Sequence, residues 1–146
     1  MSDSDGDVEV VRALLAALDA GDFDRVRELT AEDFSTTPVM TGRPMARAEW
    51  LSSHAEVHAA FPSMRRNPDH FRSEGDAVHV TLHVTATHDH PVRLPALGIE
   101  EIAPTGRRLV VPPHEDTFTL RDGKVVSVRS DIPPGGGLRG MLEQIR

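Results

Sequence analysis

Four ionisable residues near the C-terminus have a spacing that could support acid/base chemistry. They lie on either side of an Asp-Gly pair at 122–123, a dipeptide that favours a two-residue β-hairpin turn. In such a hairpin all cross-strand pairs have the same sum of residue numbers, which predicts Asp116 opposite Arg129 and His114 opposite Asp131. Opposed side chains lie about 5 Å apart, so both pairs could form ion pairs on one face.

The pattern alone leaves open which face of this hairpin is buried. Phe118 and Leu120 share the face of the four charges, whereas Thr117, Val126 and Val128 share the other. If the charged face meets solvent, its ion pairs contribute little to stability. If it lines an apolar pocket, two carboxylates, an arginine and a histidine have displaced acidities and can move protons.

The composition excludes several other chemistries. The 146 residues include no cysteine, no tyrosine and one lysine, Lys124, so thiol nucleophiles, disulfides and tyrosine donors are impossible. A net charge of -7 repels nucleic acid. With 38% hydrophobic residues and no apolar run of about 20 residues, we expect a globular, cytoplasmic protein without a membrane segment or secretory signal.

The positions of apolar residues predict helices first and strands afterwards. Apolar residues three or four apart predict helices over 8–20, after the cap residue Asp22, and over 47–61. Residues 1–7 are expected to be disordered. Alternating apolar residues then predict strands over 78–87, 107–121 and 125–132, with a long loop over 89–106 and a final helix over 138–145.

This order of elements favours the α+β class, with the N-terminal helices packed on one face of a curved antiparallel sheet. Neither an internal repeat nor a linker divides the chain. We therefore expect one domain over residues 1–146.

Short motifs throughout the chain match those of one protein family. They are FPSMR at 61–65, SEGD at 73–76, TH at 87–88, LGI at 97–99, PTGR at 104–107 and DTFTLRDGK at 116–124. Together they resemble the SnoaL-like polyketide cyclases of the nuclear transport factor 2-like superfamily. No single motif is specific, but their order is, and with the N-terminal helices the resemblance covers nearly the whole chain.

The resemblance implies a cone-shaped fold with a deep apolar pocket, usually dimerised through the outer face of the sheet. It also implies that Asp116 faces the pocket and is the acid/base of an intramolecular aldol condensation on a polyketide-like carbonyl compound. Cyclases of this family need no metal or organic cofactor. The expected partners are a small-molecule substrate and a second copy of the chain, with neither nucleic acid nor membrane.

Three features depart from the family pattern. Arg129 stands where tryptophan is common, His114 stands where a small residue is usual, and the loop from 88 to 104 is longer than usual. An arginine opposite Asp116 would lower the pKa of that carboxyl group.

We assign candidate roles accordingly. Asp116 is the principal base, His114 and His88 are the acid or enolate-stabilising partners, and Arg129 and Asp131 tune them. The predicted pocket wall comprises Trp50, His54, Phe61, Leu97 and Phe118.

Three other functions remain open. A cluster of Asp116, Arg129 and Asp131 would resemble the Asp-Arg-Asp cluster of limonene epoxide hydrolase. With such a cluster the protein would be an epoxide hydrolase. A non-catalytic binding module is the second alternative. A metal site built from segments 88–90 and 114–116 is the third, although Pro91 argues against a continuous strand there, and we expect none.

Overall fold

The computed structural model describes residues 4–38, 41–95 and 98–146. The first half forms helices and two short strands: α1 (Ser4–Ala20), α2 (Phe23–Leu29), β1 (Ser35–Thr36), β2 (Met45–Ala46) and α3 (Arg47–Ala60). The second half forms β3 (Asp69–Glu74), β4 (Ala77–Leu82), β5 (Thr85–Thr87), β6 (Val92–Leu94), β7 (Ile99–Ile102), β8 (Arg108–Val110), β9 (His114–Arg121), β10 (Lys124–Asp131) and α4 (Gly137–Ile145).

The helices form where the apolar spacing predicts them. The inner stripe of α1, including Val11, Leu14 and Leu18, is buried, and Asp22 caps α2 by accepting a hydrogen bond from the backbone N–H of Arg25 at 3.2 Å. The prediction of disorder is wrong for residues 4–7, which belong to α1. Residues 1–3 lie outside the described part of the chain.

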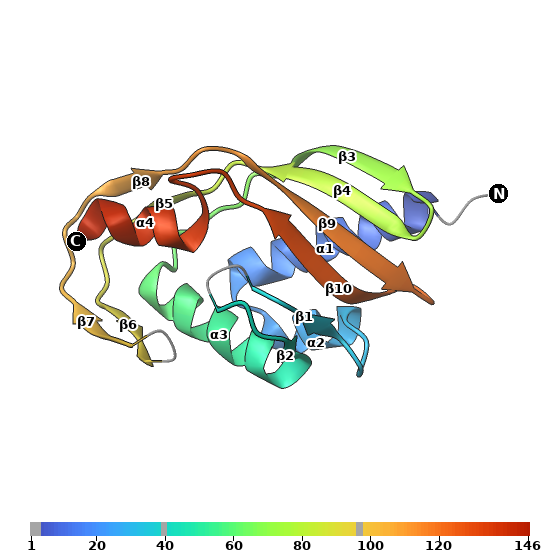
Figure 1. The fold of residues 1–146 in the computed structure, drawn as a ribbon, viewed down its shortest axis with the longest axis horizontal. Helices are drawn as coiled ribbons and strands as arrows, with labels where there is room; N and C mark the ends of the chain where they lie inside the picture. Colours follow the sequence, from blue (N-terminus) through green and yellow to red (C-terminus); the bar gives the residue numbers. More distant parts are fainter. Residues whose placement is uncertain (1–3, 39–40, 96–97) are drawn as a thin grey trace.

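A four-stranded antiparallel sheet in the order β10-β9-β4-β3 covers the N-terminal helices. Figure 1 shows α1, α2 and α3 on one side of this sheet, while β5 and β8 continue β4 and β9 past a bend towards α4. The β6–β7 hairpin packs against α3. These layers confirm the predicted α+β architecture of helices on a curved antiparallel sheet.

The strand predictions need three corrections. The predicted strand 78–87 is interrupted after Leu82, and the predicted strand 107–121 is interrupted between β8 and β9, where Pro112 and Pro113 provide no backbone N–H donor. The predicted loop 89–106 contains the β6–β7 hairpin. Strand β3, absent from the prediction, is an edge strand whose residues are exposed except for the half-buried Phe71.

The hairpin turn was predicted correctly, but the register beyond it was not. Lys124 lies opposite Arg121 and Val125 opposite Leu120, as expected, and a β-bulge between Val125 and Ser127 then shifts the pairing by one residue. A bulge inserts one extra residue into one strand, so every later side chain of β10 has a different partner from the one predicted.

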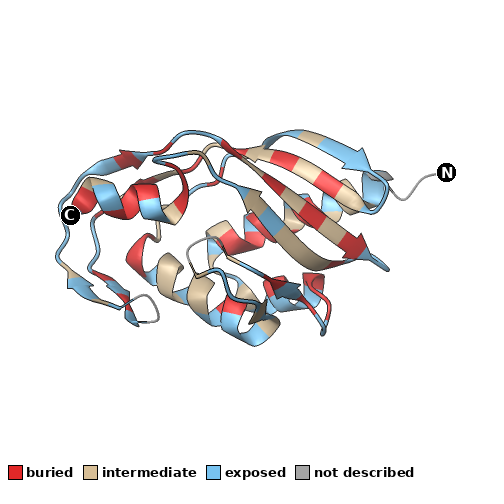
Figure 2. Ribbon diagram, in the orientation of Figure 1, coloured by how far each residue is buried: buried red, intermediate tan, exposed pale blue. Residues whose placement is uncertain are grey.

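Inward-facing residues alternate along the central strands. Figure 2 shows this alternation on β9, where buried and half-buried positions follow one another. Buried apolar side chains from α1, α2 and α3 meet those of β4, β9 and α4 in one continuous core. Within the described residues, no helix is both long enough and apolar enough to cross a membrane.

Helix α4 depends on a glycine at its closest approach to the preceding loop. A Cβ atom at Gly140 would overlap the carbonyl oxygen of Gly135, which is backbone and cannot rotate away. Gly140→Ala is therefore expected to destabilise the protein by about 1–3 kcal/mol, the usual cost of overpacking. Urea unfolding followed by circular dichroism measures this loss.

Gly6→Ala is the matched control for this prediction, because Gly6 lies in α1 with open space where a Cβ would be. Alanine there should leave stability unchanged or raise it slightly, by up to about 1 kcal/mol. Equal stability of the Gly140→Ala variant and the unmodified protein would contradict the tight packing of α4.

Candidate functional site

The inner face of β9 carries a buried carboxylate and a buried imidazole. Asp116 and His114 are two residues apart on one strand, so their side chains point to the same face, and they are only 8% and 9% exposed. The Nε2 atom of His114 lies 3.2 Å from Oδ1 of Asp116. Of the two faces left open by the pattern, the one carrying His114, Asp116 and Phe118 is therefore buried.

Unpartnered polar atoms concentrate in the interior of this protein. Among the described residues, the buried side-chain nitrogen and oxygen atoms without a hydrogen bond are Nδ1 of His54, Nε2 of His88, Nδ1 of His114 and Oδ1 of Asp116. Buried polar groups are normally hydrogen-bonded, and exceptions require a ligand, a water molecule or a catalytic role. Three histidines and one aspartate thus offer free donors and acceptors inside the fold.

Arg129 and Asp131 do not belong to this buried pair. The bulge places Ser130 opposite Asp116, while Arg129 lies opposite Thr117 and Asp131 opposite Glu115. Both Arg129 and Asp131 are exposed on the outer face of the sheet. The predicted cross-strand ion pairs of Asp116 and His114 are therefore wrong, and so is the Asp-Arg-Asp cluster built on them.

Ser130 is the inner-face neighbour that the sequence pattern missed. It is half-buried and lies directly opposite Asp116 on β10, with Val80 opposite Asp116 on β4. A hydroxyl group beside a carboxylate can donate a hydrogen bond to it or to a ligand. Ser130 faces Asp116 only because of the β-bulge between Val125 and Ser127, and the local sequence does not predict this bulge.

Helix α3 carries Trp50 and His54, two residues of the predicted pocket wall. The Trp50 ring lies 4.6 Å from the ring of Phe34 and 4.6 Å from that of His54, measured between centroids. His54 is half-buried as a residue, and its Nδ1 atom is buried without a hydrogen-bond partner.

The other predicted wall residues are Phe61, Phe118 and Leu97. Phe61 and Phe118 are almost completely buried and belong to the core. Leu97 lies outside the described residues.

Burial lowers the pKa of His54 to about 3, and the positive charge of Arg66 contributes in the same direction. The unfolded chain, with an ordinary histidine pKa near 6.5, therefore binds a proton before the folded protein does. This stabilising contribution is complete above about pH 6.5 and is lost as the pH falls towards 3, at no more than about 1.4 kcal/mol per pH unit.

His54→Gln is expected to remove this part of the acid sensitivity. Urea unfolding at pH 7 and pH 5 should show a smaller loss of stability in the variant than in the unmodified protein. His90→Gln is the control, since His90 is exposed. The same pH dependence in the His54→Gln variant and the unmodified protein would contradict the buried neutral state of His54.

His88 is fully buried but lies away from the His114–Asp116 pair. Its neighbour Thr87 pairs with Arg108 on β8, whereas His114 pairs with Leu82 on β4, so the bend between β4 and β5 separates the two regions. His88 is completely buried, and its hydrogen bonds join it to Thr105 rather than to His114 or Asp116. A role for His88 as a partner of Asp116 stays a prediction.

The His88 ring has a defined tautomer. The backbone N–H of Thr105 donates to Nδ1 at 3.1 Å, so the neutral ring carries its proton on Nε2. Burial lowers the pKa of His88, against the opposing effects of Asp89 and the Ile102 carbonyl group. His88 is thus a neutral N–H donor at a second position of the interior, near Phe61.

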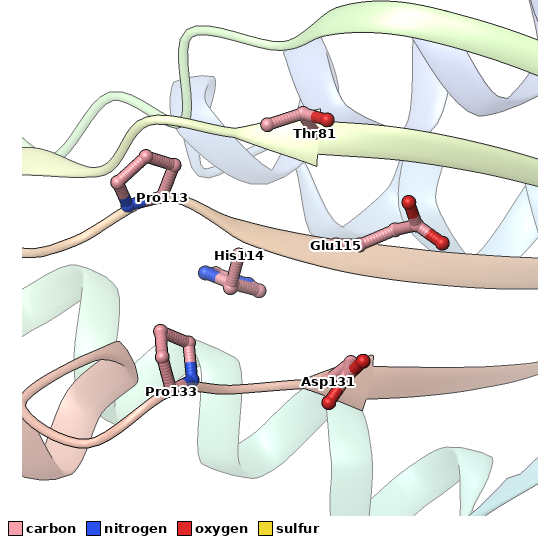
Figure 3. Close-up of a pocket in the computed structure, with 6 residues that line it drawn as sticks. All are labelled: Thr81, Pro113, His114, Glu115, Asp131 and Pro133. Carbon is pink, nitrogen blue, oxygen red and sulfur yellow. The ribbon is translucent and has the colours of Figure 1, made fainter.

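An open pocket of about 330 Å³ adjoins His114, within the usual size range for small-molecule sites. It is lined by Thr81, Pro113, His114, Glu115, Asp131 and Pro133, and Figure 3 shows His114 between β9 and the segment that carries Pro133.

In the described part of the chain, no group of three or more histidine, aspartate or glutamate side chains has an arrangement that could hold a metal ion.

Comparisons with known proteins identify the family. The model of the SnoaL-like domain matches residues 11–128. The chain belongs to the SnoaL-like family. The resemblance of the motifs and the predicted nuclear transport factor 2-like fold are thereby confirmed.

Two solved structures show the extent of this similarity. A protein from Jannaschia sp. CCS1, provisionally assigned as a SnoaL-like polyketide cyclase, is 25% identical, with a TM-score of 0.74 and coverage of 90% of this chain and 88% of that one. IdmH from Streptomyces antibioticus, provisionally assigned as a polyketide cyclase, is also 25% identical, with a TM-score of 0.73 and coverage of 94% and 96%.

A third solved structure is similar to this chain in its fold alone. AclR from Streptomyces galilaeus, provisionally assigned as a hydroxylase, is 20% identical, with a TM-score of 0.78 and coverage of 97% and 96%. A comparison with curated proteins finds no match. These structurally similar proteins therefore carry different assigned activities on one fold, so the activity must be argued from the site.

Proposed function

We propose that this SnoaL-like protein is a cofactor-independent cyclase or isomerase that uses Asp116 as a base on an oxygenated, polyketide-like carbonyl compound. The observation that carries the proposal is the buried Asp116 carboxylate, whose Oδ1 has no hydrogen bond and lies beside the His114 ring. The provisional cyclase assignments of IdmH and the Jannaschia protein support the same reaction class.

An intramolecular aldol closure uses the groups present at this site. Asp116 takes a proton from the carbon next to a carbonyl group, so that a C–H bond breaks and an enolate forms. The enolate carbon attacks a second carbonyl carbon of the same molecule, a C–C bond closes the ring, and the new alkoxide takes the proton back. The product is an isomer of the substrate, so the step needs neither oxidant nor reductant.

The neighbouring groups bind and orient the substrate. Ser130 and His114 flank Asp116 and can hydrogen-bond to substrate oxygens, and the neutral imidazole of His54 offers a further donor and acceptor from α3. Apart from Arg66, no arginine or lysine is buried among the described residues, and Arg66 is bound to Asp19. The site therefore favours a neutral substrate rich in hydroxyl and carbonyl groups over an anionic one.

The hydrolase alternative loses its structural basis, because Arg129 and Asp131 lie on the face opposite Asp116. A homodimer through the outer sheet face and a cytoplasmic location stay predictions. Light scattering of the purified protein measures the first of these.

Product analysis tests the proposed reaction. Acyclic hydroxylated diketones of increasing length are incubated with the protein in water labelled with oxygen-18, and products are analysed by mass spectrometry. We expect a cyclic isomer of unchanged mass apart from exchange of unreacted carbonyl oxygens. Binding of the diketones without any conversion would instead identify a non-catalytic binding module.

A further inference from the structure

Asp116 lies on a part of the inner sheet face that is otherwise mostly apolar. Val80 lies opposite Asp116 on β4, and Phe118 is the next residue on the same face of β9. Both are buried. The polar neighbours of Asp116 among the described residues of this face are His114 on β9 and Ser130 on β10. The sheet therefore offers two side chains that could donate a hydrogen bond to a substrate oxygen beside Asp116.

One nitrogen atom of the His114 ring already lies next to the carboxylate. Its Nε2 atom is 3.2 Å from Oδ1 of Asp116, and its Nδ1 atom is buried without a hydrogen bond. A hydrogen bond from Nε2 to a substrate oxygen would therefore compete with the contact to the carboxylate.

The Ser130 hydroxyl group has no such competitor. Ser130 is half-buried, and its side chain forms no hydrogen bond with any of the described residues. The Asp116 side chain is 11% exposed. Both side chains are thus polar and partly accessible on the same face of the sheet.

The register of β9 and β10 sets the separation of these two groups. Ser130 lies directly opposite Asp116, and opposed side chains on one face have Cβ atoms about 4.5–5.5 Å apart. In an enolate, one carbon atom separates the carbon that loses the proton from the oxygen that takes the charge. A carboxylate and a hydroxyl group at this separation can therefore contact the carbon and the oxygen of one enolate together.

The β-bulge in β10 determines which side chain lies opposite the base. In a regular hairpin the partner of Asp116 would be Arg129, whereas the bulge puts Ser130 in that position. A guanidinium group there would stabilise the ionised carboxylate and so weaken it as a base. A hydroxyl group carries no charge, so it can stabilise an enolate without weakening the base in this way.

We propose that the Ser130 hydroxyl group donates a hydrogen bond to the enolate oxygen that forms when Asp116 removes a proton from carbon. The inference rests on the proposed function, because it requires an enolate at Asp116. In this step a C–H bond breaks, the proton forms an O–H bond with the carboxylate, and the electron pair forms a C=C bond while the carbonyl oxygen becomes negative. Ser130 keeps its own proton. Its hydrogen bond strengthens as the oxygen becomes negative, so it stabilises the enolate more than the ketone.

Binding of 4-nitrophenol tests this donor without turnover. The phenolate form resembles an enolate, since its negative oxygen atom is attached to a conjugated carbon, and it absorbs at a different wavelength from the neutral phenol. The background is Asp116→Asn, which resembles the protonated carboxyl group of the enolate complex and does not repel an anion. We expect the phenolate to bind this variant in an absorbance titration. The additional change Ser130→Ala should weaken binding about 10–100-fold, the usual effect of losing a hydrogen bond to a charged group.

Two other changes in the same background are the controls. Ser127→Ala is the same replacement on the same strand, but Ser127 lies opposite Thr119 on the outer face, so phenolate binding should not change. Ser130→Thr keeps a hydroxyl group and should weaken binding less than Ser130→Ala does. Equal phenolate binding with and without Ser130→Ala, or an equal loss with Ser127→Ala, would overturn the inference. Failure of the phenolate to bind the Asp116→Asn variant would overturn it as well.

Kinetics with a diketone that the protein cyclises separate this inference from the proposed base. Loss of one donor to a developing oxyanion usually lowers kcat about 10²–10³-fold, and KM should change little, because the ketone gains less from the hydrogen bond than the enolate does. If kcat is unchanged in Ser130→Ala and lost in Asp116→Asn, the donor is refuted and the base is retained. Unchanged activity in Asp116→Asn would instead refute the proposed function.

Discussion

Asp116→Asn lowers the rate of ring closure by about 10²–10⁴-fold, the usual contribution of a positioned general base. The amide has nearly the size of the carboxylate but cannot accept a proton from carbon at neutral pH. The buried surroundings of Asp116 contain no other carboxylate on the inner face of β9. The measurement is kcat and KM for any diketone that the unmodified protein cyclises.

The matched control for this variant is Asp76→Asn, the same replacement in the exposed turn between β3 and β4. It should retain the activity of the unmodified protein. A circular dichroism spectrum and an unfolding curve show whether Asp116→Asn is folded. A folded variant that cyclises as fast as the unmodified protein would show that Asp116 is not the base.

Two kinds of information in the sequence predict where Asp116 lies. The Asp-Gly turn and the alternation of β9 placed His114, Asp116, Phe118 and Leu120 on one face, and the structure confirms both. In the turn, Asp122 and Gly123 have φ values of 54° and 75°, as a two-residue hairpin requires. The choice of the buried face came from the family motif, because either face had apolar residues.

The error in the pairing has a long-range cause. The edge of β10 away from β9 is bound by the N-terminal half: the backbone N–H of Ala31 donates to the Val125 carbonyl at 2.9 Å, and the Thr36 hydroxyl donates to the Val128 carbonyl at 2.6 Å. The bulge lies between these attachment points. Local propensity at 124–131 contains no information about contacts almost 100 residues away, so a regular ladder was the natural prediction.

The missed strands have a similar explanation. Strand β3 has mostly polar residues and pairs only with β4, so it lacks the apolar alternation by which a half-buried strand is predicted. The β6–β7 hairpin lies in a segment rich in proline and glycine and packs on α3. In both cases the neighbouring element determines the strand, whereas the helices, whose apolar stripes are local, were predicted almost to their ends.

Asp19→Ala is expected to cost about 3–5 kcal/mol of stability, because it leaves a buried arginine without its partner. Arg66 and Asp19 have side chains only 9% and 18% exposed, and Nη1 of Arg66 lies 2.6 Å from Oδ1 of Asp19. The backbone N–H of Arg66 donates to the other carboxylate oxygen at 3.3 Å. The pair joins the end of α1 to the segment after α3.

The position of Asp19 in α1 supports this interpretation. A carboxylate in the last turn of a helix meets the negative end of the helix dipole, so the helix alone disfavours it. Urea unfolding followed by the fluorescence of Trp50, the only tryptophan, measures the loss. Asp19→Asn keeps an acceptor for one of the two Arg66 bonds and should lose less, so it tests the pair even if Asp19→Ala fails to fold.

Two further variants compare the contributions of a buried ion pair and a surface ion pair to stability. Glu28→Ala removes the partner of Arg25 in an exposed ion pair at 3.1 Å, and it should cost less than about 1 kcal/mol. Asp19→Ala combined with Arg66→Met removes both buried charges and should recover much of the stability lost by Asp19→Ala alone. If Asp19→Ala costs no more than Glu28→Ala, Arg66 must reach solvent in the variant, and the link between α1 and the segment beyond α3 contributes little to the fold.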